Sequence, residues 1–220
     1  MDKLLNLFHA GGFMMWPLLV LSLIAFYTIV DRVITYRSIR GKANGLLDLV
    51  LEPIQNGDIT GAAQALEKKA GVMADCLRVA LEYRHLPVPQ VERIIQEVGE
   101  EQFNQLEEKL PILDTTTTIS PLLGLLGTLV GMIATFQAIS ASHNSADNNA
   151  ILAGVGEALY ATATGLSIAV ICFIAYNYFS ARQRAIVGET ELATTKLINV
   201  LIEAKAIGYG PEPEKETVKI

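Results

Sequence analysis

Cysteine, histidine and tryptophan are scarce in this 220-residue sequence, which contains two cysteines, three histidines and one tryptophan. His9, His85 and His143 stand in separate regions without the spacing of metal ligands, so we predict no metal site. Cys76 lies in a polar stretch and Cys172 in an apolar one. Such different surroundings argue against a disulfide between them.

The sequence also lacks the local patterns of covalent catalysis and phosphate binding. It contains no Ser/His/Asp order, no glycine-rich phosphate loop and no Cys-x-x-Cys pair. Basic residues gather in no patch and the net charge is −6 at pH 7, unlike a nucleic-acid-binding protein. We therefore predict a protein that is not an enzyme, has no catalytic residues, needs no cofactor and binds no nucleic acid.

Long apolar runs are the main feature that is present. Hydrophobic residues make up 51% of the chain and charged residues 18%, which is too apolar for an ordinary soluble domain. As helices rising about 1.5 Å per residue, three runs are long enough to cross about 30 Å of hydrocarbon. We predict an all-α membrane protein with three transmembrane helices, a helical cytoplasmic domain and a long third helix that extends into the cytoplasm.

Basic residues beside the runs predict the orientation. Arg32 and Arg37 follow the first run and Arg182 and Arg184 follow the third, whereas residues 140–149 contain no lysine or arginine. Positive residues favour the cytoplasmic side. The predicted divisions are a periplasmic N-terminus (1–12), a first span (13–31), a cytoplasmic helical loop (32–114), a second span (115–139), a periplasmic loop (140–149), a third span (150–179), a cytoplasmic helix extension (180–207) and a disordered acidic tail (208–220).

Helix-breaking residues divide the long loop. Asn-Gly-Asp at residues 56–58 predicts a helix end followed by an N-cap, and Gly71 and the prolines at 87 and 89 predict further breaks. Beyond the prolines, apolar residues recur on a helical period opposite charged ones, which predicts an amphipathic helix. These residues are Val91, Ile94, Ile95, Val98, Leu106 and Leu110.

Small and weakly polar residues form a stripe along the second predicted span. Gly124, Thr128, Gly131 and Thr135 share one helical face, and Gly127 with Gly131 makes a Gly-x-x-x-Gly pair. Small residues let helices approach closely. The stripe is therefore either a packing seam or the polar lining of a pathway, and the sequence leaves both open.

The third predicted span carries a carboxylate, Glu157, which is costly in hydrocarbon and is typical of an ion pathway. Five residues separate Glu157 from Thr162, a turn of about 140° on a helix. We hypothesise that Thr162 faces a lumen together with Thr128, while Glu157 faces an adjacent helix. The alternative is that Glu157 lies near the outer interface and serves only assembly, and that the threonines only bond their own helix.

The predicted ion-pathway residues are thus Thr128, Thr162 and Glu157. Additional polar lining is predicted at Tyr160, Thr164 and Thr135, and helix packing at Gly124, Gly127, Gly131 and Gly165.

Two segments, PLLGLLGTLVGM (121–132) and GEALYATATGL (156–166), resemble the membrane motifs of the ExbB, TolQ and MotA family, most of all those of ExbB chains. The resemblance implies a subunit of the bacterial inner membrane that forms a homopentamer in the lipid bilayer around two copies of an ExbD-like single-span protein. It implies that the proton motive force drives work on a TonB-like protein for outer-membrane nutrient import. By the same resemblance, Thr128 and Thr162 line the lumen near a membrane aspartate of the partner, and Glu157 serves function or assembly.

The sequence departs from the ExbB pattern at Tyr160 and Thr164, where apolar side chains are more common. Their oxygens leave sodium open as the translocated ion beside the proton. Three alternatives therefore remain: a TolQ-like cell-envelope energiser, a sodium-coupled stator, and a non-conducting scaffold in which Glu157 and the glycines only hold helices together.

Overall fold

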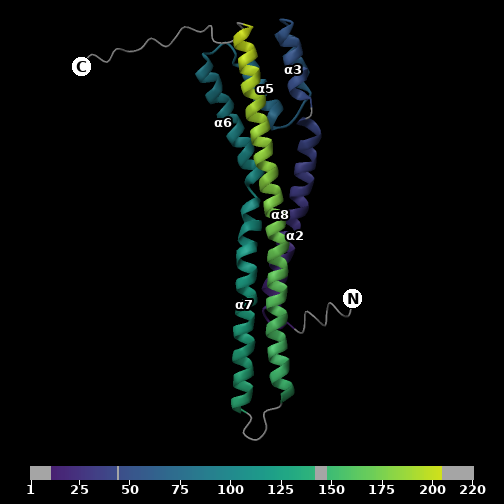
Figure 1. Ribbon diagram of the computed structural model, residues 1–220, viewed down its shortest axis with the longest axis vertical. Coiled ribbons are helices and arrows are strands. Elements are labelled where there is room, and N and C mark those ends of the chain that lie inside the picture. Colours follow the sequence, from purple (N-terminus) through teal and green to yellow (C-terminus); the bar gives the residue numbers. More distant parts are fainter. Residues whose placement is uncertain (1–10, 44, 142–147, 205–220) are drawn as a thin grey trace, which may run out of the picture. The chain divides into compact units, whose positions relative to one another are not determined.

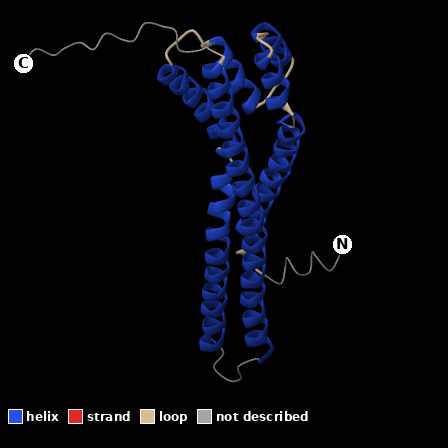
Figure 2. Cartoon of the chain, turned by 45° about the horizontal axis from the view of Figure 1, so that its top comes forward, coloured by secondary structure: helices blue, strands red, loops and turns tan. Residues whose placement is uncertain are grey.

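The chain is helical throughout the part that the structure describes. The computed structural model describes residues 11–43, 45–141 and 148–204, and within these ranges it contains no strand (Figures 1 and 2). The helices are α2 (Met15–Ala43), α3 (Leu46–Gln55), α4 (Ile59–Glu67), α5 (Val72–Glu82), α6 (Val88–Glu107), α7 (Leu110–Ala141) and α8 (Asn148–Glu203). The predicted all-α class is confirmed.

Three helical segments among the described residues are long and apolar enough to cross a membrane. They are Met15–Arg37, Val88–Gln137 and Leu152–Glu203. Their outer surfaces keep large apolar side chains exposed, such as Leu129 at 55% and Phe136 at 62% on α7. A helix that is apolar on its outer side suits lipid or a neighbouring subunit. The chain is therefore a multi-pass membrane protein, as predicted.

The third membrane helix is continuous. Helix α8 contains 56 residues, from Asn148 to Glu203, which confirms the prediction of a long third helix. It ends at Glu203, before the predicted limit of 207. The predicted acidic tail 208–220 and most of the predicted N-terminal segment, residues 1–10, lie outside the described residues.

Several helix ends differ from the predicted segment boundaries. Helix α2 begins at Met15 because Gly12, with φ of +66°, turns the chain just before it, and α2 continues to Ala43. Helix α7 starts at Leu110, so both ends of the predicted loop 32–114 belong to long helices.

The predicted loop 140–149 is shorter than expected. Helix α7 continues to Ala141, and in its last turn the Ser140 hydroxyl donates to the Phe136 carbonyl oxygen at 3.0 Å. Helix α8 begins at Asn148, and residues 142–147 lie outside the described residues. Apolar runs mark only the lipid-facing part of a helix, because backbone hydrogen bonding continues into polar sequence. The positions of the spans relative to a bilayer stay predictions.

Contacts divide the chain into two compact units. The first, here the membrane unit, comprises Met1–Arg32 and Lys109–Ser180. The second, here the loop unit, comprises Val33–Glu108 and Ala181–Ile220. Each unit has its own packing and is described separately.

The helix ends in the loop unit follow the predicted punctuation. Asn56 is the C-cap of α3, and Asp58 is the N-cap of α4, accepting a hydrogen bond from the Gly61 backbone N–H at 2.8 Å. Such a cap satisfies one of the free N–H groups at a helix start. Gly71 and Pro87 precede α5 and α6. The predicted breaks at 56–58, 71 and 87 are confirmed.

One apolar core joins the helices of the loop unit. Helix α5 supplies Leu77 and Ala80, both fully buried, and α6 supplies Val91 and Ile95. The acidic residues of α6 lie on its exposed side, so the predicted amphipathic helix is confirmed. Other buried members are Leu46, Val50 and Ile54 of α3, Leu66 of α4, and Leu197 and Leu201 of α8.

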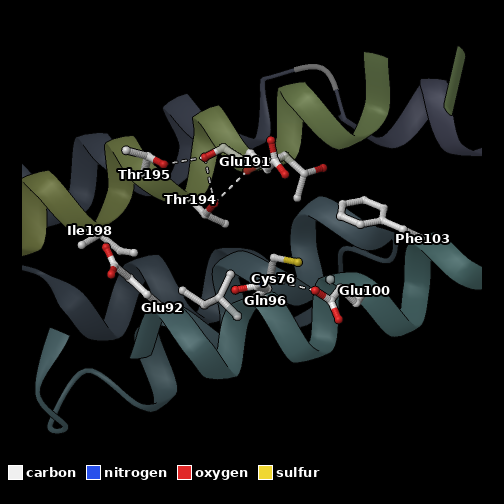
Figure 3. A pocket seen from close by; sticks show the side chains of 12 residues that line it. Cys76, Glu92, Gln96, Glu100, Phe103, Glu191, Thr194, Thr195 and Ile198 are labelled. Carbon is white, nitrogen blue, oxygen red and sulfur yellow. Dashed lines mark hydrogen bonds between the residues drawn. The ribbon is translucent and has the colours of Figure 1, made fainter. Parts of the chain in front are cut away.

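A cavity of about 310 Å³ lies beside this core, among α5, α6 and α8 (Figure 3). Its lining includes three carboxylates, Glu92, Glu100 and Glu191, and the Gln96 amide donates to Glu100 at 2.9 Å. The Cys76 thiol also lines it but is only 1% exposed. Two causes raise the pKa of the Cys76 thiol to about 11: burial, which is the larger, and the nearby negative charge of Asp75.

We predict that the Cys76 thiol is inert at neutral pH. A pKa of about 11 against an ordinary value of 9.0 leaves about a hundredfold less thiolate, the reactive form. In a Cys172→Ala variant, the native protein should therefore react with iodoacetamide at pH 8 about a hundredfold more slowly than the same protein unfolded in denaturant. Equal rates would contradict this burial.

Cys76 also makes the free energy of unfolding fall as the pH rises. Because the pKa is raised in the folded state, the contribution of the neutral thiol is fully present below pH 9 and is lost as pH rises toward 11.

Candidate ion-pathway site in the membrane unit

Helices α7 and α8 lie side by side in the membrane unit (Figure 1), and glycines bring their backbones together. A Cβ atom on Gly124 would stand 3.0 Å from the Thr162 Cα and 3.2 Å from the Ala161 carbonyl oxygen. A Cβ on Gly165 would overlap the Ser120 carbonyl oxygen and stand 3.2 Å from the Gly124 Cα. A side chain at Gly165 would collide with the backbone of α7, and one at Gly124 would be in unusually tight contact with the backbone of α8.

Two further glycines of α7 continue the contact. A Cβ on Gly127 would stand 2.7 Å from the Ala161 Cβ, and one on Gly131 would stand 3.1 Å from the Ala158 Cβ. Ala158 and Ala161 are 3% and 1% exposed. These glycines and alanines form the α7–α8 seam, a stripe of small residues along which both helices pack closely.

Thr162 joins the two helices across the seam. Its hydroxyl donates to the Gly124 carbonyl oxygen on α7 at 2.9 Å, and it also lies 3.3 Å from the Ala158 carbonyl oxygen on its own helix. The bond to α7 needs the short distance that Gly124 allows. Within one chain, the Thr162 hydroxyl therefore faces α7, at the seam.

Thr128 lies on α7 and is half-buried. Its hydroxyl donates to the Leu125 carbonyl oxygen of its own helix at 2.7 Å. The Thr128 and Thr162 hydroxyls thus bond to different carbonyls. A hydroxyl oxygen that donates its proton can still accept hydrogen bonds. Both oxygens can therefore accept a hydrogen bond from water or from a protonated carboxyl group.

The other predicted lining residues occupy two different surroundings. Thr135 is 7% exposed, donates to the Gly131 carbonyl oxygen at 2.9 Å and packs against Gly154, so it belongs to the seam. Tyr160 is 44% exposed, and the Thr164 hydroxyl donates to its carbonyl oxygen at 2.8 Å. In the single chain, Tyr160 lies on an open face of α8.

Glu157 is exposed on α8 and lies against the turn that precedes α2. Its carboxylate occupies the space that a Cβ on Gly12 would take. The Gly12 backbone is therefore a neighbour of Glu157 within the chain. Gly12 is not among the residues predicted from the sequence, although a pair of glycines stands directly before the first apolar run.

An ion pair joins α2 to the start of α7. The Lys109 ammonium lies 3.1 Å from the Asp31 carboxylate and 5.6 Å from the centre of the Tyr27 ring. Arg32, whose side chain is 6% exposed, also contacts Asp31 at 3.1 Å. Arg32 was predicted only as an orientation marker, and the pairing of Asp31 with Lys109 was not predicted, because Lys109 is remote in the sequence.

Oxygen atoms are the polar groups that this site offers. Among residues 11–43, 45–141 and 148–204, no three His, Cys, Asp or Glu side chains gather into a metal site. The arrangement can accept hydrogen bonds from water or from a protonated carboxyl group.

Comparison with known proteins places the chain in a family. The model of the MotA/TolQ/ExbB proton channel family matches residues 61–192, which include Thr128, Glu157 and Thr162. The chain therefore belongs to this family. Its members are proton channel and transport subunits of membranes.

Individual relatives come from both the ExbB and the TolQ branches. The putative biopolymer transport protein ExbB-like 1 of Synechocystis is 29% identical over 184 residues, covering 82% of this chain and 72% of the relative. The biopolymer transport protein exbB1 of Vibrio cholerae is 30% identical over 176 residues, covering 77% and 76%. The Tol-Pal system protein TolQ of Pseudomonas aeruginosa is 42% identical over 84 residues, covering 38% and 36%.

We predict that Gly165→Ala destabilises the membrane unit. The added methyl group would overlap the Ser120 carbonyl oxygen, so the helices must separate, and overpacking of this kind costs about 1–3 kcal/mol. Thermal unfolding of the purified protein in detergent, followed by circular dichroism, measures the change.

The matched control for Gly165→Ala is Gly156→Ala on the same helix. A Cβ at Gly156 meets nothing within 4 Å, so this change should leave the melting temperature equal or slightly higher, because alanine favours helix. Equal melting temperatures for the two variants would refute the close seam.

Proposed function

We propose that the chain is a subunit of an ion-driven motor or channel in the bacterial inner membrane, and that it works with a single-span partner. The observation that carries the proposal is the pair of threonine hydroxyls on neighbouring helices, Thr128 on α7 and Thr162 on α8, whose oxygens can still accept hydrogen bonds. Thr162 and Thr128 lie in the segment that matches a proton channel family. The relatives named biopolymer transport proteins support a transport role.

In this proposal the ring of subunits supplies hydroxyls and the partner supplies the titrating group. A homopentamer would surround two copies of an ExbD-like protein, whose membrane aspartate lies near Thr128 and Thr162. A hydroxyl that turns its proton away from its carbonyl partner donates to the charged carboxylate, and the hydroxyl oxygen accepts a bond from the neutral carboxyl group. Either protonation state then costs little, so each proton delivered can bias the position of one subunit against another.

The motion would drive a TonB-like protein that supports nutrient import at the outer membrane. The N-terminus would lie in the periplasm and the C-terminus in the cytoplasm, as the arginines after the first and third spans favour. The proton is the proposed ion, in keeping with the family description.

A TolQ-like role in the cell envelope is the second candidate. It is favoured by the 42% identity to the Pseudomonas aeruginosa TolQ, although that match covers 38% of this chain. Two readouts in strains that lack their own proteins separate the candidates. Restored uptake of iron carriers supports the nutrient-import role, whereas restored resistance to detergents supports the envelope role.

Two further alternatives rest on particular side chains. Tyr160 and Thr164 place oxygens on α8 where sodium could be coordinated, which favours a sodium-coupled stator. The bond from Thr162 to Gly124 is also what a non-conducting scaffold would use.

We predict that Thr128→Val and Thr162→Val abolish ion-driven activity but preserve assembly. Valine keeps the shape of threonine and removes the hydroxyl, and losing one such bond between membrane helices costs about 0.6 kcal/mol on average. Activity is measured by complementation and assembly by the yield of purified complex. The control is serine at each position, which keeps the hydroxyl and should retain activity. Full activity of both valine variants would instead support the scaffold.

We predict that the chain alone conducts poorly, because the titrating aspartate belongs to the partner. Purified chain is reconstituted in liposomes with and without an ExbD-like protein, and flux is followed under a proton gradient and, separately, under a sodium gradient. Proton flux only with the partner is expected. Strong flux from the chain alone would contradict the division of roles, and sodium flux alone would identify a sodium-coupled protein.

A further inference from the structure

The turn before α2 holds a fixed conformation next to Glu157. Gly12 has φ of +66°, which glycine adopts readily and other residues adopt rarely. The backbone N–H of Met15 donates to the Gly12 carbonyl oxygen at 3.1 Å, and that of Trp16 donates to the Phe13 carbonyl oxygen at 3.3 Å. These bonds close the turn directly before the helix begins.

The turn also rests on the α7–α8 seam. A Cβ on Gly127 would stand 3.4 Å from the Cβ of Met14, so Met14 covers the surface of α7 at Gly127. Met15 and Leu18, in the first helical turns of α2, are 7% and 0% exposed. The start of α2 is therefore packed in place, and Gly12 cannot move freely away from α8.

We propose that Gly12 is a positioning residue for the Glu157 carboxylate. The carboxylate lies where the Cβ of any other residue at position 12 would stand. Because Gly12 has no side chain, it leaves this space open, and we call the space the Glu157 seat. This inference deepens the proposed function, because it assigns Glu157 a fixed place against the first span of its own chain. The seat lies beside the start of α2, and the N-terminal end of a helix favours a carboxylate nearby.

Two effects of a side chain at position 12 must be separated in the test. Gly12→Ala introduces both a collision with Glu157 and the strain of a positive φ. Gly45→Ala introduces only the strain, because Gly45 has φ of +76° and a Cβ there meets nothing within 4 Å. Glu157→Asp shortens the side chain by one methylene, which withdraws the carboxylate from the seat.

The experiment uses the full chain with its single-span partner in liposomes and measures driven ion flux for four variants: Gly12→Ala, Gly45→Ala, Glu157→Asp and the double variant Gly12→Ala with Glu157→Asp. We expect flux to fall about tenfold in Gly12→Ala, the size of a strong coupling between contacting residues, and to stay near wild type in Gly45→Ala. In the double variant, flux should return to that of Glu157→Asp alone. Such a rescue requires the two side chains to compete for one space.

Two results would overturn the proposal. One is wild-type flux in Gly12→Ala. The other is a double variant whose loss equals the product of the two single losses, because the substitutions would then act independently. The melting temperatures of the same four variants provide a second readout of the contact. If the wild-type complex shows no driven flux, the proposed function fails, and the melting temperatures still decide whether Gly12 and Glu157 are coupled.

Discussion

The structure of the membrane unit depends on the close approach of α7 and α8. In hydrocarbon a backbone polar group has no water to bond, so a helix satisfies these groups within the spanning segment, and a hydrogen bond between helices needs a side chain. A threonine side chain is short, and it reaches the neighbouring helix only where the two backbones nearly touch. Gly124 and Gly165 provide that distance, and the Thr162 hydroxyl uses it.

Other hydroxyls of the membrane unit show what happens without such a contact. Thr28 and Thr116 are buried, and each donates to the carbonyl four residues earlier in its own helix. That arrangement satisfies the hydroxyl but adds no bond between helices. Thr162 has the same option at Ala158 and bonds to α7 at a shorter distance. Whether the threonine hydroxyl bonds to the neighbouring helix or to its own therefore depends on the glycine of the facing helix.

The sequence predicts those features that depend on neighbouring residues. Apolar runs predict three long helices, and local chemistry predicts the C-terminal end of α3 and the cap at Asp58. The contacts of Glu157 with Gly12, and of Asp31 with Lys109, join residues far apart in the chain. Periodicity alone cannot pair them, because each contact depends on how the helices pack. Helix ends also extend past the apolar runs, since apolar residues mark the lipid boundary and not the last hydrogen bond.

The separation of Glu157 and Thr162 around α8 follows from helix geometry. Five residues correspond to a rotation of about 140°, so the two side chains address different neighbours. Thr162 bonds to α7, and Glu157 lies against the turn at Gly12. Helix α8 is thereby held at both places within its own chain. Close-packed helices leave little empty space between them, so α8 has little freedom to slide along α7. In the ion-driven complex that we propose, the membrane unit of each subunit would then move as one body, and the step that follows protonation would occur between subunits or at the partner.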